Sequence, residues 1–320
     1  MPELERLALA CISPGFPGYD PPDWVRRRLS EGLGGVCLFA WNVRDVEQVA
    51  GLTSALRAEN PAVLVSADEE GGDVTRLEVA TGSSYPGNLA LGLVDDVAVT
   101  AEVGAAIGSL CARAGVNFDL APCADVNSNP DNPVIGVRSF GSDPELVARH
   151  VRAFVAGLQR CHVAGCAKHF PGHGDTAQDS HLELPRAEGD LEGALLPFRA
   201  AIEADVKAIM TAHIVVPSLD AAPATLSSNV LTGLLRDELG FDGLVVTDAL
   251  EMRAVADTVG VEESAVQALL AGADALCLGH DLADAAVESV CRAITSAVED
   301  GRLPVDRLAE AAGHVEAVDW

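Results

Sequence analysis

The sequence predicts a single-domain α/β fold, a (β/α)8 barrel, and three observations lead to this prediction. The chain has 320 residues, of which 49% are hydrophobic, so it can bury one large core. Eight short apolar runs alternate with helical segments, a pattern typical of a parallel sheet covered on both faces. Polar residues gather where these runs end. The expected strands cover residues 7–13, 35–39, 62–67, 116–121, 165–169, 208–213, 243–247 and 273–278.

The segments between these strands carry helix ends that support the alternation. Asp143 directly precedes Pro144, which indicates an N-cap followed by a proline in the first helical turn. Another helix is expected to begin near Asp190, and Gly240 follows the helix expected over residues 231–239. No linker or low-complexity tract interrupts the series, so one barrel domain of the TIM type is expected over residues 1–320.

Charge limits the partners that the protein can have. The formal net charge of −27 disfavours binding to nucleic acid or to an anionic membrane surface, so we expect neither partner. The acidic N-terminus lacks the basic start of a signal peptide, and we see no apolar stretch of about 18 residues. We therefore expect a cytoplasmic protein with a small or neutral substrate.

The cysteine pattern agrees with a reducing compartment. The eight cysteines form no C-x-x-C pair, and five of them lie in strand-like runs. They are expected to be buried small hydrophobic residues without a disulfide framework. The five are Cys11, Cys37, Cys123, Cys166 and Cys277.

Candidate functional residues follow the expected strands, at the rim where barrels of this kind carry their catalytic groups. A single pocket is therefore predicted. The residues are Asp68 after the third strand, Asp125 after the fourth, Lys168 and His169 at the end of the fifth, His213 after the sixth, Asp248 after the seventh and His280 after the eighth.

A long segment without helical or strand periodicity follows the fifth strand, over residues 169–181. Loops of this length in compact domains are usually functional, so we expect a lid. In an extended stretch, residues two apart point to the same side. Asp179 can then accept a hydrogen bond from His181 and fix its tautomer, which leaves the other ring nitrogen free to exchange a proton.

The same segment carries a resemblance to a known family. Residues 168–176 (KHFPGHGDT), followed by DSH at 179–181, closely resemble the signature of family 3 glycoside hydrolases of the bacterial β-N-acetylglucosaminidase branch. Further similar blocks are DEEGG at 68–72 with Arg76, NPVIG at 132–136 with Arg138, and GFDG at 240–243 continuing to Asp248. These blocks extend over most of the chain.

The resemblance implies a role for each matching residue. Asp248 matches the nucleophilic carboxylate, and His181 paired with Asp179 matches the general acid/base of this branch. The residues that match the sugar-binding positions are Asp68, Arg76, Arg138, Lys168 and His169. Asp125 and His213 are assigned supporting roles only. The implied activity is retaining hydrolysis of terminal β-linked N-acetylglucosamine, in which one group attacks the anomeric carbon and another protonates the leaving oxygen. It requires no metal and no cofactor, and the implied substrate is a GlcNAc-containing saccharide or a muropeptide fragment of peptidoglycan.

Several alternatives stay open at this point. Asp73 stands where relatives usually carry a basic residue, which puts the outer subsite in doubt. His169, His173, His181, His213 and Asp248 could instead be ligands in a metal-dependent amidohydrolase-like barrel. Lys168 could form a Schiff base in a lyase. A β-glucosidase or a sugar-binding protein without turnover would also fit the fold.

Overall fold

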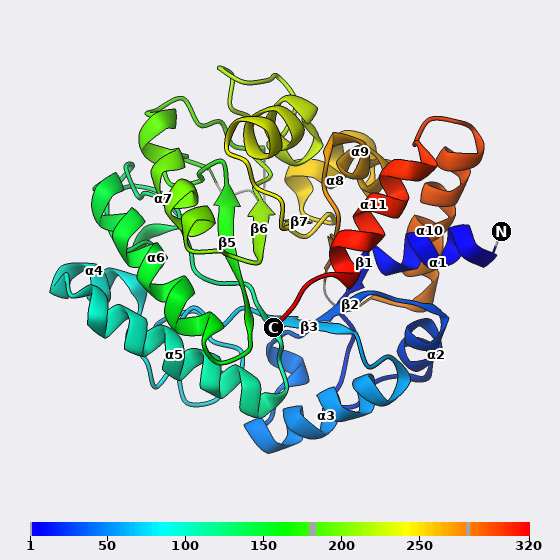
Figure 1. Cartoon of the computed structure of the whole chain (residues 1–320), viewed down its shortest axis with the longest axis horizontal. Helices are drawn as coiled ribbons and strands as arrows, with labels where there is room; N and C mark the ends of the chain where they lie inside the picture. Colours follow the sequence, from blue (N-terminus) through cyan, green and yellow to red (C-terminus); the bar gives the residue numbers. More distant parts are fainter. Residues whose placement is uncertain (1, 179–183, 280–281) are drawn as a thin grey trace.

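The computed structural model describes residues 2–178, 184–279 and 282–320. It is an α/β fold in which parallel strands occupy the centre and helices surround them, as Figure 1 shows. The strands are β1 (Ile12–Pro14), β2 (Gly35–Cys37), β3 (Leu64–Ala67), β4 (Phe118–Asp119), β5 (Ala164–Phe170), β6 (Ala208–Thr211), β7 (Leu244–Thr247) and β8 (Leu276–Leu278).

The strands form a curled parallel sheet made of two hydrogen-bonded ladders. Six strands pair in the order β2-β3-β4-β5-β6-β7, and β1 pairs with β8. A single parallel bridge between Val246 and Ala275 links the two ladders on the β7 side. The predicted parallel α/β sheet is therefore confirmed, whereas the ladders of the described residues do not close into one eight-stranded ring.

The helices mostly follow the sequence signals. Asp143 caps α6 by accepting a hydrogen bond from the backbone of Glu145, and Asp190 caps α7 in the same way through Gly193. The segment expected as a helix over residues 231–239 is a π-helix, η4 (Asn229–Glu238), and Gly240 follows it with a φ of 71°. The other helices are α1 (Pro2–Ala10), α2 (Asp23–Glu31), α3 (Val46–Glu59), α4 (Asn88–Val94), α5 (Val97–Ala114), α6 (Pro144–Gln159), α7 (Leu191–Glu203), α8 (Arg253–Val259), α9 (Val261–Ala271), α10 (Asp284–Glu299) and α11 (Val305–Glu316), with short turns η1 (Ala40–Asn42), η2 (Gly136–Arg138) and η3 (Ala224–Leu226).

The first strand corrects the sequence prediction. Residues 7–10 of the expected strand belong to helix α1, and β1 begins only at Ile12. Leu4 and Leu7 pack against the core three residues apart, so this apolar run is one face of a helix. A short apolar run cannot be assigned to helix or strand from periodicity alone, which is why the boundary was misplaced.

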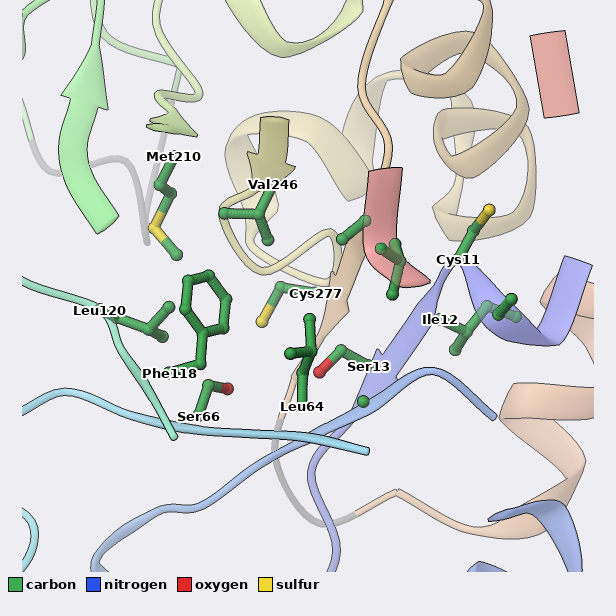
Figure 2. Close-up of a pocket in the computed structure, with 14 residues that line it drawn as sticks. Cys11, Ile12, Ser13, Leu64, Ser66, Phe118, Leu120, Met210, Val246 and Cys277 are labelled. Carbon is green, nitrogen blue, oxygen red and sulfur yellow. The ribbon is translucent and has the colours of Figure 1, made fainter. Parts of the chain in front are cut away.

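The two faces of the sheet bury different side chains. Val36, Val65 and Ile209 belong to the large core shared with the helices, whereas their strand neighbours Cys37, Leu64 and Met210 belong to a second cluster on the other face. This alternation is the normal consequence of the strand pleat. Figure 2 shows part of the second cluster around a small void of about 20 Å³. This void lies beneath the site described below, because Met210 and Cys277 line both spaces.

Within the described residues, helix α5 is long and apolar enough to cross a membrane by length and composition, with a mean hydropathy of 1.3 over 18 residues. The sequence-based expectation that no such stretch exists overlooked this helix. In the fold, α5 packs closely against α6: Gly104 lies so near the backbone of Phe154 that a Cβ would come within 2.6 Å of its carbonyl oxygen. The core helix of a soluble protein passes the same test of length and composition.

Candidate active site

A cavity of about 420 Å³ opens where the strands end, and six of the predicted site residues line it. They come from four separate strand ends, so the fold brings together residues that are up to 180 positions apart in the chain. The six are Asp68, Arg76, Arg138, Lys168, His169 and Asp248. The predicted proton donor pair, Asp179 and His181, lies outside the described residues, and so does His280.

One side of the cavity is a network of five charged side chains. The Lys168 ammonium lies 2.6 Å from Asp68 Oδ1 and 2.7 Å from Glu70 Oε1. Arg76 donates to the other Asp68 oxygen over 3.0 Å, and Arg138 donates two hydrogen bonds to Glu70. Charges this deeply buried are stable only when paired, and here each carboxylate faces two cations.

This pairing sets the ionisation of the network. Burial alone would raise the pKa of Asp68, but the charges of Lys168 and Arg76 hold it well below its usual range. Glu70 follows the same pattern: despite its burial, Arg138 and Lys168 lower its pKa to about 2. The pKa of Lys168 is raised, against the effect of its burial, by Asp68 and Glu70. All these groups are therefore charged at neutral pH and can bind sugar hydroxyls as fixed donors and acceptors.

The carboxylate of Asp248 lies directly after β7. Its Oδ1 accepts a hydrogen bond of 2.8 Å from the backbone of Ala249, and its own backbone N–H donates to Thr211 O. Although burial raises the pKa of Asp248, His213, His169 and the Ala249 N–H together lower it below the usual value. An ionised, backbone-anchored carboxylate facing a cavity can attack an electrophilic carbon.

His213 is fully buried behind this carboxylate and is held at both ring nitrogens. Nδ1 lies 2.8 Å from the Thr225 hydroxyl, and Nε2 lies 3.0 Å from the carbonyl oxygen of Ala249. Ala249, the residue after the nucleophile candidate, is thereby fixed to the segment that follows β6. This geometry agrees with the supporting role expected for His213.

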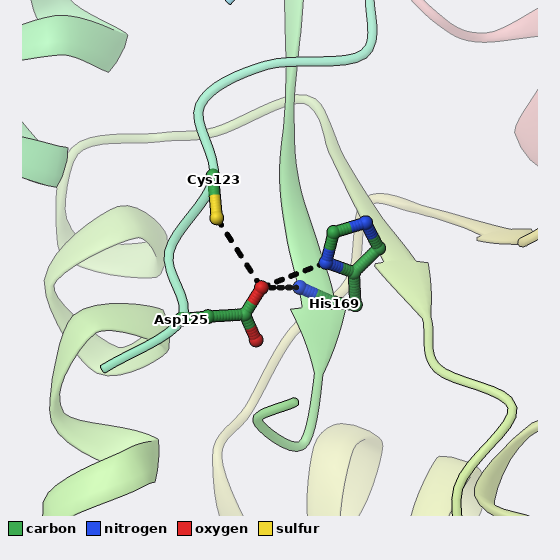
Figure 3. A group of neighbouring side chains, drawn as sticks. All are labelled: Cys123, Asp125 and His169. Atoms are coloured by element: carbon green, nitrogen blue, oxygen red, sulfur yellow. Dashed lines mark hydrogen bonds and ion pairs between the residues drawn. The ribbon is translucent and has the colours of Figure 1, made fainter. Parts of the chain in front are cut away.

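Asp125 binds the end of β5, and Figure 3 shows its carboxylate between Cys123 and His169. Its Oδ2 lies 2.7 Å from His169 Nδ1 and accepts hydrogen bonds from the His169 backbone and from the Cys123 thiol. Its Oδ1 accepts from the backbone of His173 over 2.6 Å. Asp125 therefore fixes the ring of His169 and leaves Nε2 turned toward Arg138, 3.5 Å away.

The geometry also bears on the metal and Schiff-base alternatives. Cys123, Asp125 and His169 offer three ligand atoms within 4.8 Å of one another, a spacing that could hold a metal ion. Burial and the Asp125 charge raise the pKa of Cys123 well above its usual value, and its thiol donates a hydrogen bond to Asp125. Through these hydrogen bonds the group supports the ring of His169. Lys168 has a raised pKa, the opposite of what Schiff-base formation requires.

Two residues of the site were missed from the sequence. Glu70 was noted only as part of a motif, yet it is the second counterion of Lys168 and binds Arg138. Its position two residues after Asp68 was a usable signal, because alternate residues of an extended segment share a side. Glu251 also lines the cavity, three residues after Asp248, and no sequence pattern distinguished it.

The unusual Asp73 lies outside this cavity. It lines a neighbouring cavity of about 300 Å³ together with Gly71, Gly72 and Leu93, and Arg138 lines both spaces. The departure at Asp73 therefore affects the surroundings of the site, while the network around Lys168 is complete.

Comparison with known proteins identifies similar chains. Residues 24–318 match the model of the glycosyl hydrolase family 3 N terminal domain. A beta-hexosaminidase from Alkalilimnicola ehrlichii is 40% identical over 256 residues, which cover 77% of this chain and 73% of that protein. Beta-hexosaminidase A from Pseudoalteromonas piscicida is 38% identical over 281 residues, 79% of this chain but only 47% of the relative.

Solved structures with the same fold include a family 3 beta-N-acetylglucosaminidase from Paenibacillus sp. str. FPU-7, with 42% identity and a TM-score of 0.94. The match covers 98% of this chain and 62% of that one, so the chain spans less than two thirds of this neighbour. The beta-N-acetylhexosaminidase of Beutenbergia cavernae is 27% identical with a TM-score of 0.89, and there the match covers 98% and 97% of the two chains.

Proposed function

Because the chain belongs to glycosyl hydrolase family 3, through its N-terminal domain, we propose that it is a retaining β-N-acetylglucosaminidase acting on terminal β-linked GlcNAc. The observation that carries the proposal is the cavity in which an ionised Asp248 faces the charged network around Lys168. Relatives named beta-hexosaminidase or beta-N-acetylglucosaminidase, at about 40% identity, support the same activity.

Asp248 is the nucleophile in this proposal. Double displacement requires a carboxylate that is ionised in the resting enzyme and attacks the anomeric carbon from the face opposite the leaving group. The anchoring of Asp248 to the Ala249 backbone, and of Ala249 to His213, restricts the carboxylate to one orientation. A fixed nucleophile reduces the entropy lost on reaching the transition state.

The sugar in the subsite next to the scissile bond would be bound by Asp68, Arg76, Arg138, Lys168 and His169. All five groups are held by ion pairs or by Asp125, so their donors and acceptors are oriented before substrate arrives. A cavity of about 420 Å³ lies within the range of ordinary small-ligand sites.

His181, oriented by Asp179, is the proposed general acid and base. Imidazole has an unperturbed pKa of about 6.5, so it can give a proton to the leaving oxygen and later take one from water near neutral pH. A neighbouring carboxylate stabilises the imidazolium.

Further parts of the proposal concern the whole protein. We propose that the two strand ladders belong to one (β/α)8 barrel that forms a single catalytic domain over residues 1–320. The substrate would be a peptidoglycan-derived muropeptide fragment, met in the cytoplasm, and neither nucleic acid nor membrane would be a partner. The net charge of −27 supports the proposal that neither nucleic acid nor a membrane is a partner.

A comparison of matched aryl glycosides tests the activity. The aryl β-N-acetylglucosaminide should be cleaved at least about tenfold better, by kcat/KM, than the β-glucoside, because contacts to the acetamido group contribute on the order of 1.4 kcal/mol. Proton NMR should show the β-anomer as the first product. An equal or reversed preference would refute the assignment as a hexosaminidase, and initial α-product would refute double displacement.

A second experiment tests the proton donor. His181→Ala should slow substrates with basic leaving groups by about 10²–10⁴-fold and affect activated aryl substrates far less in their first step. Azide needs no general base, so it should restore turnover and yield a β-glycosyl azide. Uniform loss across leaving groups, without azide product, would remove His181 from this role.

A further inference from the structure

The floor of the cavity is rich in sulfur. Four side chains from alternate strands lie there: Cys37 ends β2, Leu120 follows β4, Met210 belongs to β6 and Cys277 to β8. All four line the cavity that also contains Asp248 and Lys168. Three of the four carry sulfur, so the surface beneath the catalytic carboxylate is a soft, polarisable one.

The two thiols in this floor are neighbours. The side chain of Cys277 interacts directly with that of Cys37, and this contact, followed by burial, raises the pKa of Cys277 well above its usual value. Both residues are buried, with 1% and 6% of their surface exposed. Figure 2 shows the Cys277 side chain inside the sheet, on the same side as Met210. The strands of the two thiols, β2 for Cys37 and β8 for Cys277, are separated by β1, which pairs with β8 through Ser13 and Cys277.

We propose that Cys37 and Cys277 form a binding site for a soft, thiophilic cation such as Hg²⁺ at the floor of the active-site cavity. Each thiol loses its proton to solvent, and two metal–sulfur bonds form, so one Hg²⁺ replaces two protons and yields a neutral dithiolate without any redox step. Thiolates select soft cations over Mg²⁺ or Ca²⁺. Met210, in the same floor, offers a thioether as a weaker third donor.

This site would make the protein sensitive to thiophilic metals. An ion bound by Cys37 and Cys277 occupies the space beneath the sugar, in the cavity that Asp248 also lines, and the Asp248 carboxylate must stay free to attack. Occupation therefore blocks hydrolysis, and a bound saccharide slows entry of the ion. Alkylation should behave differently, because a thiol with a raised pKa is a poor nucleophile at neutral pH.

Metal binding can be measured directly, independently of activity. The protein, with Cys161→Ser introduced to remove the one thiol among the eight that is not fully buried, is titrated with HgCl₂. Thiolate-to-mercury charge-transfer absorption and metal analysis after desalting then give affinity and stoichiometry. We expect one tightly bound ion, at least about 100-fold weaker binding in Cys37→Ser or Cys277→Ser because the second bond of a chelate is intramolecular, and no binding of Mg²⁺. Cys166→Ser is the matched control, since Cys166 is buried in the same cluster but does not line the cavity.

The outcomes separate this proposal from the hydrolase assignment. Retention of tight Hg²⁺ in the Cys37→Ser/Cys277→Ser double variant would overturn the site, whether or not the protein hydrolyses GlcNAc. Where a serine variant unfolds, as judged by circular dichroism, the alanine variant replaces it. With an active enzyme, inhibition should follow occupancy and be delayed by GlcNAc. Full occupancy without inhibition would overturn the proposed block of the cavity.

Discussion

The two ends of the sheet each carry a buried charge network, and they differ in one respect. At the starting ends of β7 and β8, Asp274 is fully buried and bonded by Arg236 over 2.6 Å and by Arg307 over 2.7 Å. At the finishing ends, Lys168 is equally buried and bonded by Asp68 and Glu70 over similar distances. Only the second network lines the 420 Å³ cavity.

The comparison shows that ion pairing by itself does not identify a functional site. Asp274 joins η4, β7 and α11, because it also accepts a hydrogen bond from the backbone of Val245. All of these bonds of Asp274 connect elements of the fold to one another, and none of them faces the cavity. The network around Lys168 is also internally paired, but its groups border open space and can exchange part of their bonding for sugar hydroxyls. Rims of parallel α/β folds divide between stability and function in this way.

The largest effect should come from Asp248, which has no counterpart in the Asp274 network. Asp248→Asn keeps the shape of the side chain but removes the negative charge needed for attack. We expect kcat/KM to fall by at least about 10⁴-fold for every leaving group, with an unchanged urea midpoint. Steady-state kinetics and equilibrium unfolding measure both quantities. Residual activity within tenfold of the unmodified enzyme would show that another group attacks.

Asp274→Ala should have the opposite effect: it should lower stability and leave kcat/KM unchanged. Removing this carboxylate leaves two arginines with an uncompensated buried charge, which costs about 3–5 kcal/mol of the free energy of unfolding. The fraction that remains folded should hydrolyse substrate with an unchanged kcat/KM. Urea unfolding and kinetics at low temperature test the pair of expectations. A variant of normal stability with poor activity would invert the contrast between the two ends.

Lys168→Met tests the same difference between the two networks, now in the network that lines the cavity. It leaves Asp68 and Glu70 facing each other without their shared cation, next to space that water can enter. We expect kcat/KM to fall by about 10²–10³-fold, as for loss of one oriented polar contact to the transition state, and a smaller loss of stability than in Asp274→Ala. If Lys168→Met were less stable than Asp274→Ala, water in the cavity would not be offsetting the repulsion between the Asp68 and Glu70 carboxylates.

The sequence allowed much of this arrangement to be predicted, for identifiable reasons. Strand positions followed from apolar runs, and site residues from polar positions just after those runs, so Asp68, Lys168 and Asp248 were placed at one rim correctly. The prediction of the first strand was wrong at its start, because residues 7–10 belong to a helix whose apolar residues lie on one face. The contacts of Asp125 with His169 and His173, and the contact between Cys37 and Cys277, join residues 44 or more positions apart, and no local pattern encodes such contacts.

Asp119 is a buried carboxylate that shares features with both networks. Its replacement should have the smallest effect of the four substitutions. It ends β4, accepts a hydrogen bond from the backbone of Glu69 through Oδ1, and its Oδ2 has no hydrogen-bond partner among the described residues. Burial, followed by the charge of Glu69, raises the pKa of Asp119 well above its usual value of 3.8. Asp119 therefore supports the loop that carries Asp68 in its uncharged form.

The sign of the pH dependence follows from this raised pKa. The folded state binds the Asp119 proton more tightly than the unfolded state does, so the contribution to stability is fully present below about pH 3.8 and is lost as the pH rises through the folded pKa. Asp119→Asn keeps the bond from Glu69 and cannot ionise. Its stability relative to the unmodified protein should thus increase between pH 5 and pH 8 in urea unfolding, by no more than about 1.4 kcal/mol per pH unit. Asp95→Asn is the matched control, because hydrogen bonds from Arg149 and His150 lower the pKa of Asp95 below 3.8. Asp95 is then ionised in both the folded and the unfolded state between pH 5 and pH 8, so the stability cost of Asp95→Asn should stay constant across this window and should fall only as the pH drops below about 3.8. Parallel pH profiles for Asp119→Asn and the unmodified protein would mean that Asp119 is ionised in the fold and that its Oδ2 has a partner.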